Sequence, residues 1–144
     1  MPNAQTPAQP SPARRASRRY FTLDQANRAL ALVRRIAEDI VQQYRCVVEM
    51  QEELERLEDK GKSEAVKEKR DQLVGDVDKL QRLFDELNEV GAELKEPSIG
   101  LLDFPAMHQG REICLCWKVG EGDVSHWHEM DAGYAGRQPA DELD

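Results

Sequence analysis

The chain has 144 residues, of which 40% are hydrophobic, and a formal net charge of −8 at pH 7. This length predicts a single domain. Residues 1–20 hold four arginines and no acidic residue, so the rest of the chain carries 16 basic and 28 acidic side chains. A body this acidic repels phosphate backbones, and we therefore expect no nucleic-acid partner. Because the chain shows neither a signal-peptide pattern nor an apolar run of about 18 residues, we expect a cytoplasmic protein with no membrane partner.

Residues 1–20 are rich in proline, alanine and arginine. This composition buries too little apolar surface to offset the entropy of ordering, which predicts a disordered tail. We expect residues 21–139 to form one α+β domain, made of a helical hairpin over 22–92, a β cap over 98–130 and a C-terminal loop over 131–139. Residues 140–144 are predicted to be a frayed acidic end.

The first helix of the hairpin has a clear start signal. Thr22 and Gln25 fit a capping box, in which the hydroxyl and the amide side chains satisfy free N–H groups of the first turn. No proline or glycine interrupts residues 23–60. The pattern therefore predicts one helix from Leu23 to about Glu58.

A second helix follows a break at Asp59–Lys62. Ser63 is the expected N-cap, and Gly91 is the expected residue just after the helix. Apolar residues in both segments recur in steps of three and four, as in a coiled coil. If the chain folds back near residue 60, partners in the two seams sum to about 120 or 121, for example Ile40 with Leu80 and Tyr44 with Val77. We therefore predict an antiparallel helical hairpin that resembles a coiled coil.

Apolar residues beside these seams would stay partly exposed on two helices alone. The cover could come from the C-terminal third of the chain or from a second copy of the hairpin, which would make a four-helix bundle. We therefore expect self-association or a helical protein partner. The flanking residues are Leu32, Ile36, Val41, Val48, Met50 and Leu83.

The C-terminal third changes from helical to extended character. Three short strands are expected, over Ile99–Pro105, Glu112–Val119 and Asp123–His128, with turns at 108–110 and 120–122. The proline is expected to end the first of these strands. Trp117 and Trp127 are predicted to plug the core between sheet and helices. The predicted fold class is thus α+β, with a long helical hairpin capped by a small antiparallel sheet of about three strands.

Several short motifs of the chain match a known family in order and spacing. They are Phe21-Thr22-Leu23-Asp24 with Ala26-Asn27, Gly100 to Pro105, Leu115-Cys116-Trp117 with Gly120-Glu121, Trp127-His128, and Gly133-Tyr134 with Gly136 to Pro139. With these motifs the chain resembles the uncharacterised bacterial domain-of-unknown-function family number 2203, over about residues 20–139. The resemblance implies an α+β domain and brings no activity with it.

The sharpest chemical hypothesis is a metal site. If residues 120–122 form a three-residue loop, Cys116 lies opposite His126 and Cys114 lies opposite His128, all on one face. Such a Cys₂His₂ set suits zinc. A slip of one residue would put cysteines and histidines on opposite faces, and the resemblance supports only Cys116 and His128. The alternative is a buried thiol and a surface histidine, which are the commoner environments of these residues. Three cysteines do not predict a disulfide framework.

A second candidate is a ligand-binding pocket made of Asp103, Glu121, His128 and Arg137. These side chains could perform acid–base chemistry or bind an anionic ligand. The alternative is that salt bridges between Arg137 and the carboxylates tie the tail to the sheet.

Standard nucleotide-binding and hydrolase motifs are absent from the sequence, and no catalytic residue is predicted. We expect a non-catalytic interaction or assembly module that uses its helical hairpin. The alternatives are a metal- or small-ligand-binding protein with a site at the sheet edge, and an enzyme of unrecognised type.

Overall fold

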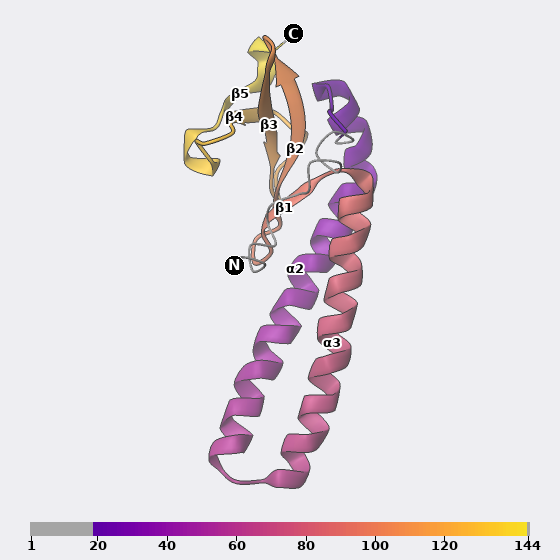
Figure 1. Cartoon of the computed structure of the whole chain (residues 1–144), viewed down its shortest axis with the longest axis vertical. Coiled ribbons are helices and arrows are strands. Elements are labelled where there is room, and N and C mark those ends of the chain that lie inside the picture. Colours follow the sequence, from indigo (N-terminus) through magenta and orange to yellow (C-terminus); the bar gives the residue numbers. More distant parts are fainter. Residues whose placement is uncertain (1–18, 144) are drawn as a thin grey trace, which may run out of the picture.

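The computed structural model describes residues 19–143, in which a long helical hairpin stands beside a five-stranded antiparallel sheet (Figure 1). Apart from Arg19 and Tyr20, the predicted disordered tail lies outside the described residues. The α+β class and the helical hairpin are confirmed. The predicted number of strands was wrong, because the sheet has five strands and not three.

Helix α2 spans Leu23–Asp59, close to the predicted bounds. The capping box is present: the N–H of Gln25 donates to Thr22 Oγ1 at 3.0 Å, and the N–H of Thr22 donates to Gln25 Oε1 at 3.0 Å. Asp24 in the first turn adds a favourable charge near the positive end of the helix dipole. The local sequence therefore fixes where this helix begins.

Helix α3 spans Ser63–Val90. Ser63 was predicted to be the N-cap, but it is the first residue of the helix. Lys62 takes the cap position and makes no capping hydrogen bond through its side chain. At the other end Gly91 has a φ of 107°, in the left-handed region that glycine adopts at low cost, and the helix stops there as expected.

The two helices run antiparallel and connect through a short turn around Gly61 (Figure 1). Gln43 Nε2 donates to the backbone oxygen of Asp76 at 2.9 Å, which lies beside the predicted pairing of Tyr44 with Val77. The faces in contact differ from the prediction at this level. Gln43 is buried, whereas Val77, predicted to lie in the seam, is 44% exposed.

The sheet follows chain order, with β1 (Glu93–Glu96), β2 (Leu101–His108), β3 (Arg111–Trp117), β4 (His126–Glu129) and β5 (Gln138–Pro139). β1 and β5 are the strands that the sequence did not predict, and β5 lies in the expected loop 131–139. Short 3₁₀ turns occupy Tyr134–Gly136 and Ala140–Glu142. Ala140, in the segment expected to fray, is buried, and its N–H donates to the oxygen of Ser125 at 2.8 Å.

Pro105 does not end β2, which continues to His108. The N and C=O of one strand residue point to the same side, and the oxygen of Pro105 accepts from the N–H of Phe21 at 2.7 Å. The missing N–H of this proline therefore faces away from β3. It falls on the side where β1, paired only as far as Asp103, has already stopped. The proline costs the sheet no hydrogen bond there.

One face of the sheet packs on the N-terminal part of α2. Trp117 is fully buried and Trp127 is 6% exposed, so the predicted core role of both tryptophans is confirmed. Asn27 joins the two layers, since its Oδ1 accepts from the N–H of Val124 at 2.7 Å and its Nδ2 donates to the oxygen of the same residue at 3.2 Å. The sheet contributes to this core Leu102, Phe104, Ala106, Ile113, Leu115, Trp117 and Trp127, and α2 contributes Ala26, Leu30, Val33, Ile36, Ala37 and Ile40.

Candidate functional site

The second face of the sheet carries the polar and sulfur-containing side chains. Because neighbours along a strand alternate between faces, residues between the core positions point away from α2. Pro105 and four polar or sulfur-containing residues among them are buried all the same, the four being Asp103, Cys114, Cys116 and His128. The 3₁₀ turn Tyr134–Gly136, in the yellow segment after β4 in Figure 1, lies on this side of the sheet.

The pairing of β3 with β4 confirms the register predicted from the three-residue loop. Cys114 pairs with His128, and Cys116 pairs with His126. On the other side of β3, Asp103 of β2 pairs with Cys116. Three adjacent strands therefore bring a carboxylate, two thiols and an imidazole to one face.

Asp103 and His128 form a buried pair, with exposed fractions of only 2% and 4%. Asp103 Oδ1 lies 3.1 Å from His128 Nε2, and His128 Nδ1 lies 2.8 Å from the backbone oxygen of Glu129. A carbonyl oxygen can only accept, so Nδ1 must carry the proton of that hydrogen bond. One proton then lies between Nε2 and Oδ1, so each of the two buried groups is the hydrogen-bond partner of the other.

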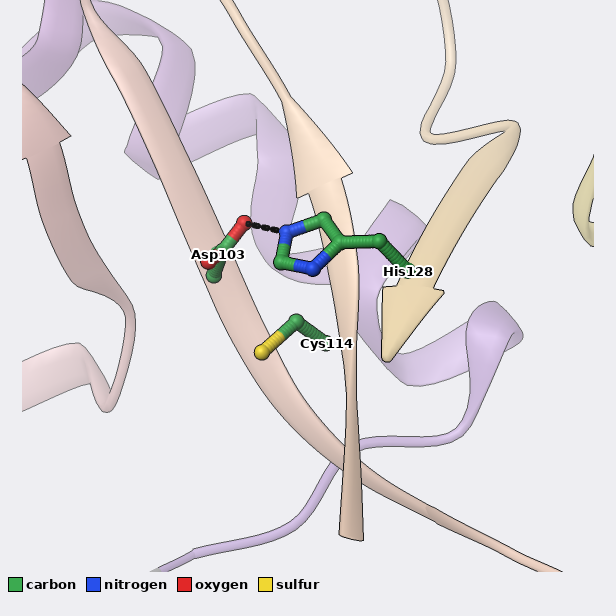
Figure 2. Close-up of side chains that lie close together, drawn as sticks. All are labelled: Asp103, Cys114 and His128. Carbon is green, nitrogen blue, oxygen red and sulfur yellow. Dashed lines mark hydrogen bonds and ion pairs between the residues drawn. The ribbon is translucent and has the colours of Figure 1, made fainter. Parts of the chain in front are cut away.

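Cys114 completes a trio with this pair (Figure 2). One ligand atom from each of Asp103, Cys114 and His128 lies within 4.8 Å of the other two. Cys114 Sγ is also 3.5 Å from Met130 Sδ. Within residues 19–143 this trio is the one group of three or more such side chains with the spacing of a metal site.

The Cys₂His₂ set expected from the sequence does not form one cluster in the structure. His126 is partly exposed, and its Nδ1 lies 3.0 Å from Ser125 Oγ. Cys116 and His126 pair across the strands, yet neither belongs to the trio. Asp103, which the sequence placed in the other candidate site, takes their place.

Burial keeps both thiols protonated. It is the main reason that the pKa values of Cys114 and Cys116 rise to about 12, and the nearby negative charge of Asp103 adds to the rise. A thiol is a weak nucleophile until it loses its proton. These cysteines are therefore inert as nucleophiles at neutral pH.

A cavity of about 240 Å³ opens beside the trio. Three of its lining residues, Met130, Gly133 and Tyr134, come from the segment after β4, and Lys95 comes from β1. None of these four residues was predicted to line a site. Gly133 and Tyr134 belong to a family motif that implies no role, and Lys95 and Met130 belong to no motif. The full lining is Lys95, Leu101, Asp103, Cys114, Cys116, His128, Met130, Gly133 and Tyr134.

The second candidate pocket separates into two pairs. Asp103 and His128 form the buried pair, whereas Arg137 donates to Glu121 through Nη1 at 2.6 Å and through Nη2 at 3.0 Å. Neither Glu121 nor Arg137 lines the cavity. The hydrogen bond from Arg137 is the main cause that lowers the pKa of Glu121. This ion pair ties the segment after β4 to the loop after β3, as the structural alternative predicted.

The fold and this site define a class: an α+β protein in which a helical hairpin backs an antiparallel sheet whose outer face holds a covered polar cluster. The chain belongs to the DUF2203 family, described as an uncharacterized conserved protein, whose model matches residues 19–140. The family predicted from the motifs is thereby confirmed. No curated protein and no solved structure matches the chain. Among residues 19–143, no helix has both the length and the apolar character needed to cross a bilayer.

Proposed function

We propose that this protein is a non-catalytic assembly module, in which the outer half of the hairpin pairs with the outer half of a second copy. The outer half is residues 48–79, the part of α2 and α3 on either side of the connecting turn. One observation carries the proposal: within these residues only Val66 is buried.

The outer half nevertheless contains many apolar side chains. Two helices bury only the stripe between them, whereas a four-helix bundle covers a second flank of each helix. Val74 is 69% exposed and Val77 is 44% exposed, one turn apart on α3. The partly buried apolar residues of the outer half are Val48, Met50, Leu54, Leu57, Ala65 and Leu73.

The charge distribution favours antiparallel pairing of two copies. Residues 60–70, at the turn, contain five basic and two acidic side chains, and residues 48–59 contain six acidic and one basic. When the outer halves of two hairpins overlap in antiparallel orientation, the basic residues 60–70 of each copy lie beside the acidic residues 48–59 of the other. Complementary charge of this kind sets the register of an interface.

The chemistry of the sheet supports a role without catalysis. The two buried thiols have pKa values of about 12. Both ring nitrogens of His128 are already engaged, one by Asp103 and one by the backbone. A catalytic acid, base or nucleophile needs a proton affinity near the working pH and a free reacting atom.

Light scattering coupled to size-exclusion chromatography tests the pairing. The full chain has a mass of 16.4 kDa, so we expect twice that mass for the wild type. Val74→Glu with Val77→Glu should return the protein to one chain, because both carboxylates would be buried at the interface. The matched control is Leu32→Glu, another exposed apolar residue of the hairpin, outside the outer half.

The control should leave the dimer intact. A wild type that stays monomeric up to high micromolar concentration contradicts the pairing, and it would favour the alternative occupant of the same surface, a helical protein partner. A dimer that is unchanged by the two glutamates also contradicts it.

A further inference from the structure

The trio on the outer sheet face has a chemistry that the assembly role does not use. We propose that Asp103, Cys114 and His128 bind a borderline-soft divalent metal ion, with zinc as the expected occupant. The ligand set is one residue from each of three adjacent strands, β2, β3 and β4. It is not the Cys₂His₂ set that the sequence predicted.

The spacing of the three side chains is close to that of a bound ion. Zinc bonds of about 2.0–2.1 Å to nitrogen or oxygen and 2.3 Å to sulfur place tetrahedral ligand atoms about 3.3–3.6 Å apart. His128 Nε2 and Asp103 Oδ1 are already 3.1 Å apart, and no ligand atom of the trio is more than 4.8 Å from another. A shift of about 1 Å, within reach of side-chain rotation, completes the geometry.

His128 is held in the state that a metal requires. Its Nδ1 proton is fixed by the oxygen of Glu129, so Nε2 is the nitrogen left to bind. Histidine ligands in metal sites are oriented in this way by a hydrogen bond from the other ring nitrogen. A metal ion would replace the proton that Nε2 now shares with Asp103, and both groups would keep a partner.

The donors around the trio are soft, which argues against calcium or magnesium. Cys114 supplies sulfur, and the thioether of Met130 lies 3.5 Å from it. Ions that prefer all-oxygen shells would find only one carboxylate here, whereas zinc accepts sulfur, nitrogen and oxygen together. The three proposed ligands line the cavity, so a water molecule from it would supply the fourth ligand of a tetrahedral shell.

Charge balance also suits a divalent ion. The thiolate of Cys114 and the carboxylate of Asp103 together neutralise two positive charges in a buried site. Binding would release two protons, that of the Cys114 thiol and the one shared by His128 and Asp103, and the affinity should therefore rise with pH.

Cobalt(II) titration of the full chain, freed of metal by a chelator, tests the site. We expect one Co²⁺ per chain and a thiolate-to-cobalt charge-transfer band, both lost when Zn²⁺ is added in competition. The wild-type spectrum alone is decisive. If no charge-transfer band develops at saturating Co²⁺, the proposal is overturned whatever the variants do.

Matched variants assign the ligands. Cys114→Ser should remove the charge-transfer band and lower the affinity at least about 100-fold, while Cys46→Ser, at an exposed thiol, should change neither. His128→Asn should weaken binding as strongly, and His126→Asn should not. Binding that survives Cys114→Ser, or that is lost in Cys116→Ser or His126→Asn with Cys114 intact, overturns this ligand set.

Discussion

Asp103 on β2 and His128 on β4 meet across the intervening strand β3, with 3.1 Å between Oδ1 and Nε2. Each side chain is buried, so neither can turn to water for a replacement partner. The pair therefore links two strands that share no backbone hydrogen bonds. Removing the pair should lower the free energy of unfolding.

Asp103→Ala should lower the free energy of unfolding by about 2–4 kcal/mol, because it leaves the buried imidazole of His128 without its acceptor. Urea denaturation followed by circular dichroism measures this change. His128→Asn should cost a similar amount. In the double variant both partners are gone, so the total loss should fall short of the sum by about 1 kcal/mol or more. Additive losses would show that the two side chains do not stabilise each other.

Alanine substitutions at Gly100 and Gly75 should have opposite effects on stability. Gly100 precedes β2 with a φ of +66°, and a Cβ there would lie 2.4 Å from Val119 Cγ2 and 3.0 Å from Val41 Cγ2. Gly100→Ala should therefore destabilise the protein by about 2–4 kcal/mol, through backbone strain and overpacking.

Gly75→Ala should do the reverse. Gly75 lies inside α3 with nothing within 4 Å of the added methyl group, and alanine favours the helix by about 1 kcal/mol. Both variants are measured by thermal and urea unfolding. If Gly100→Ala left the stability unchanged, the close approach of the turn before β2 to Val41 of α2 would not be required for stability.

The helices and the β3–β4 register were predictable from the sequence because their signals are local. The capping box at Thr22 and the absence of glycine and proline up to residue 60 define α2 without any tertiary contact. The glycine-rich loop 120–122 likewise sets which residues of β3 and β4 oppose each other. Local sequence determined these features, and tertiary packing did not override them.

The missed features depend on contacts between distant parts of the chain. β1 and β5 are short edge strands, and Glu93–Glu96 has no apolar alternation to mark it. Asp103 and His128 were predicted to share a pocket, but their direct pairing depends on β3 lying between their strands, which no local pattern states. One clue was present, since Asp103 stands between Leu102 and Phe104 in an apolar strand, where a buried carboxylate needs a partner.

The ion pair of Glu121 and Arg137 predicts a pH dependence of stability. The hydrogen bond from Arg137 lowers the pKa of Glu121 in the folded protein. The unfolded state therefore binds the proton more readily than the folded state does. The stabilisation is fully present above the pKa of an unfolded glutamate, about 4.3, and is lost as the pH falls through the lower folded value.

Glu121→Gln should accordingly cost about 1–2 kcal/mol at pH 7, since the pair is bidentate and largely shielded from solvent, with 12% of the Arg137 side chain and 25% of the Glu121 side chain exposed. The difference from the wild type should shrink as the pH falls below about 4, where the wild type also loses its charge. Glu53→Gln removes the more exposed pair with Arg56 and should cost under about 0.5 kcal/mol at either pH. Urea unfolding at pH 7 and pH 3 measures both variants, and a Glu121→Gln cost that is equal at the two pH values would mean that the ion pair contributes nothing to the fold.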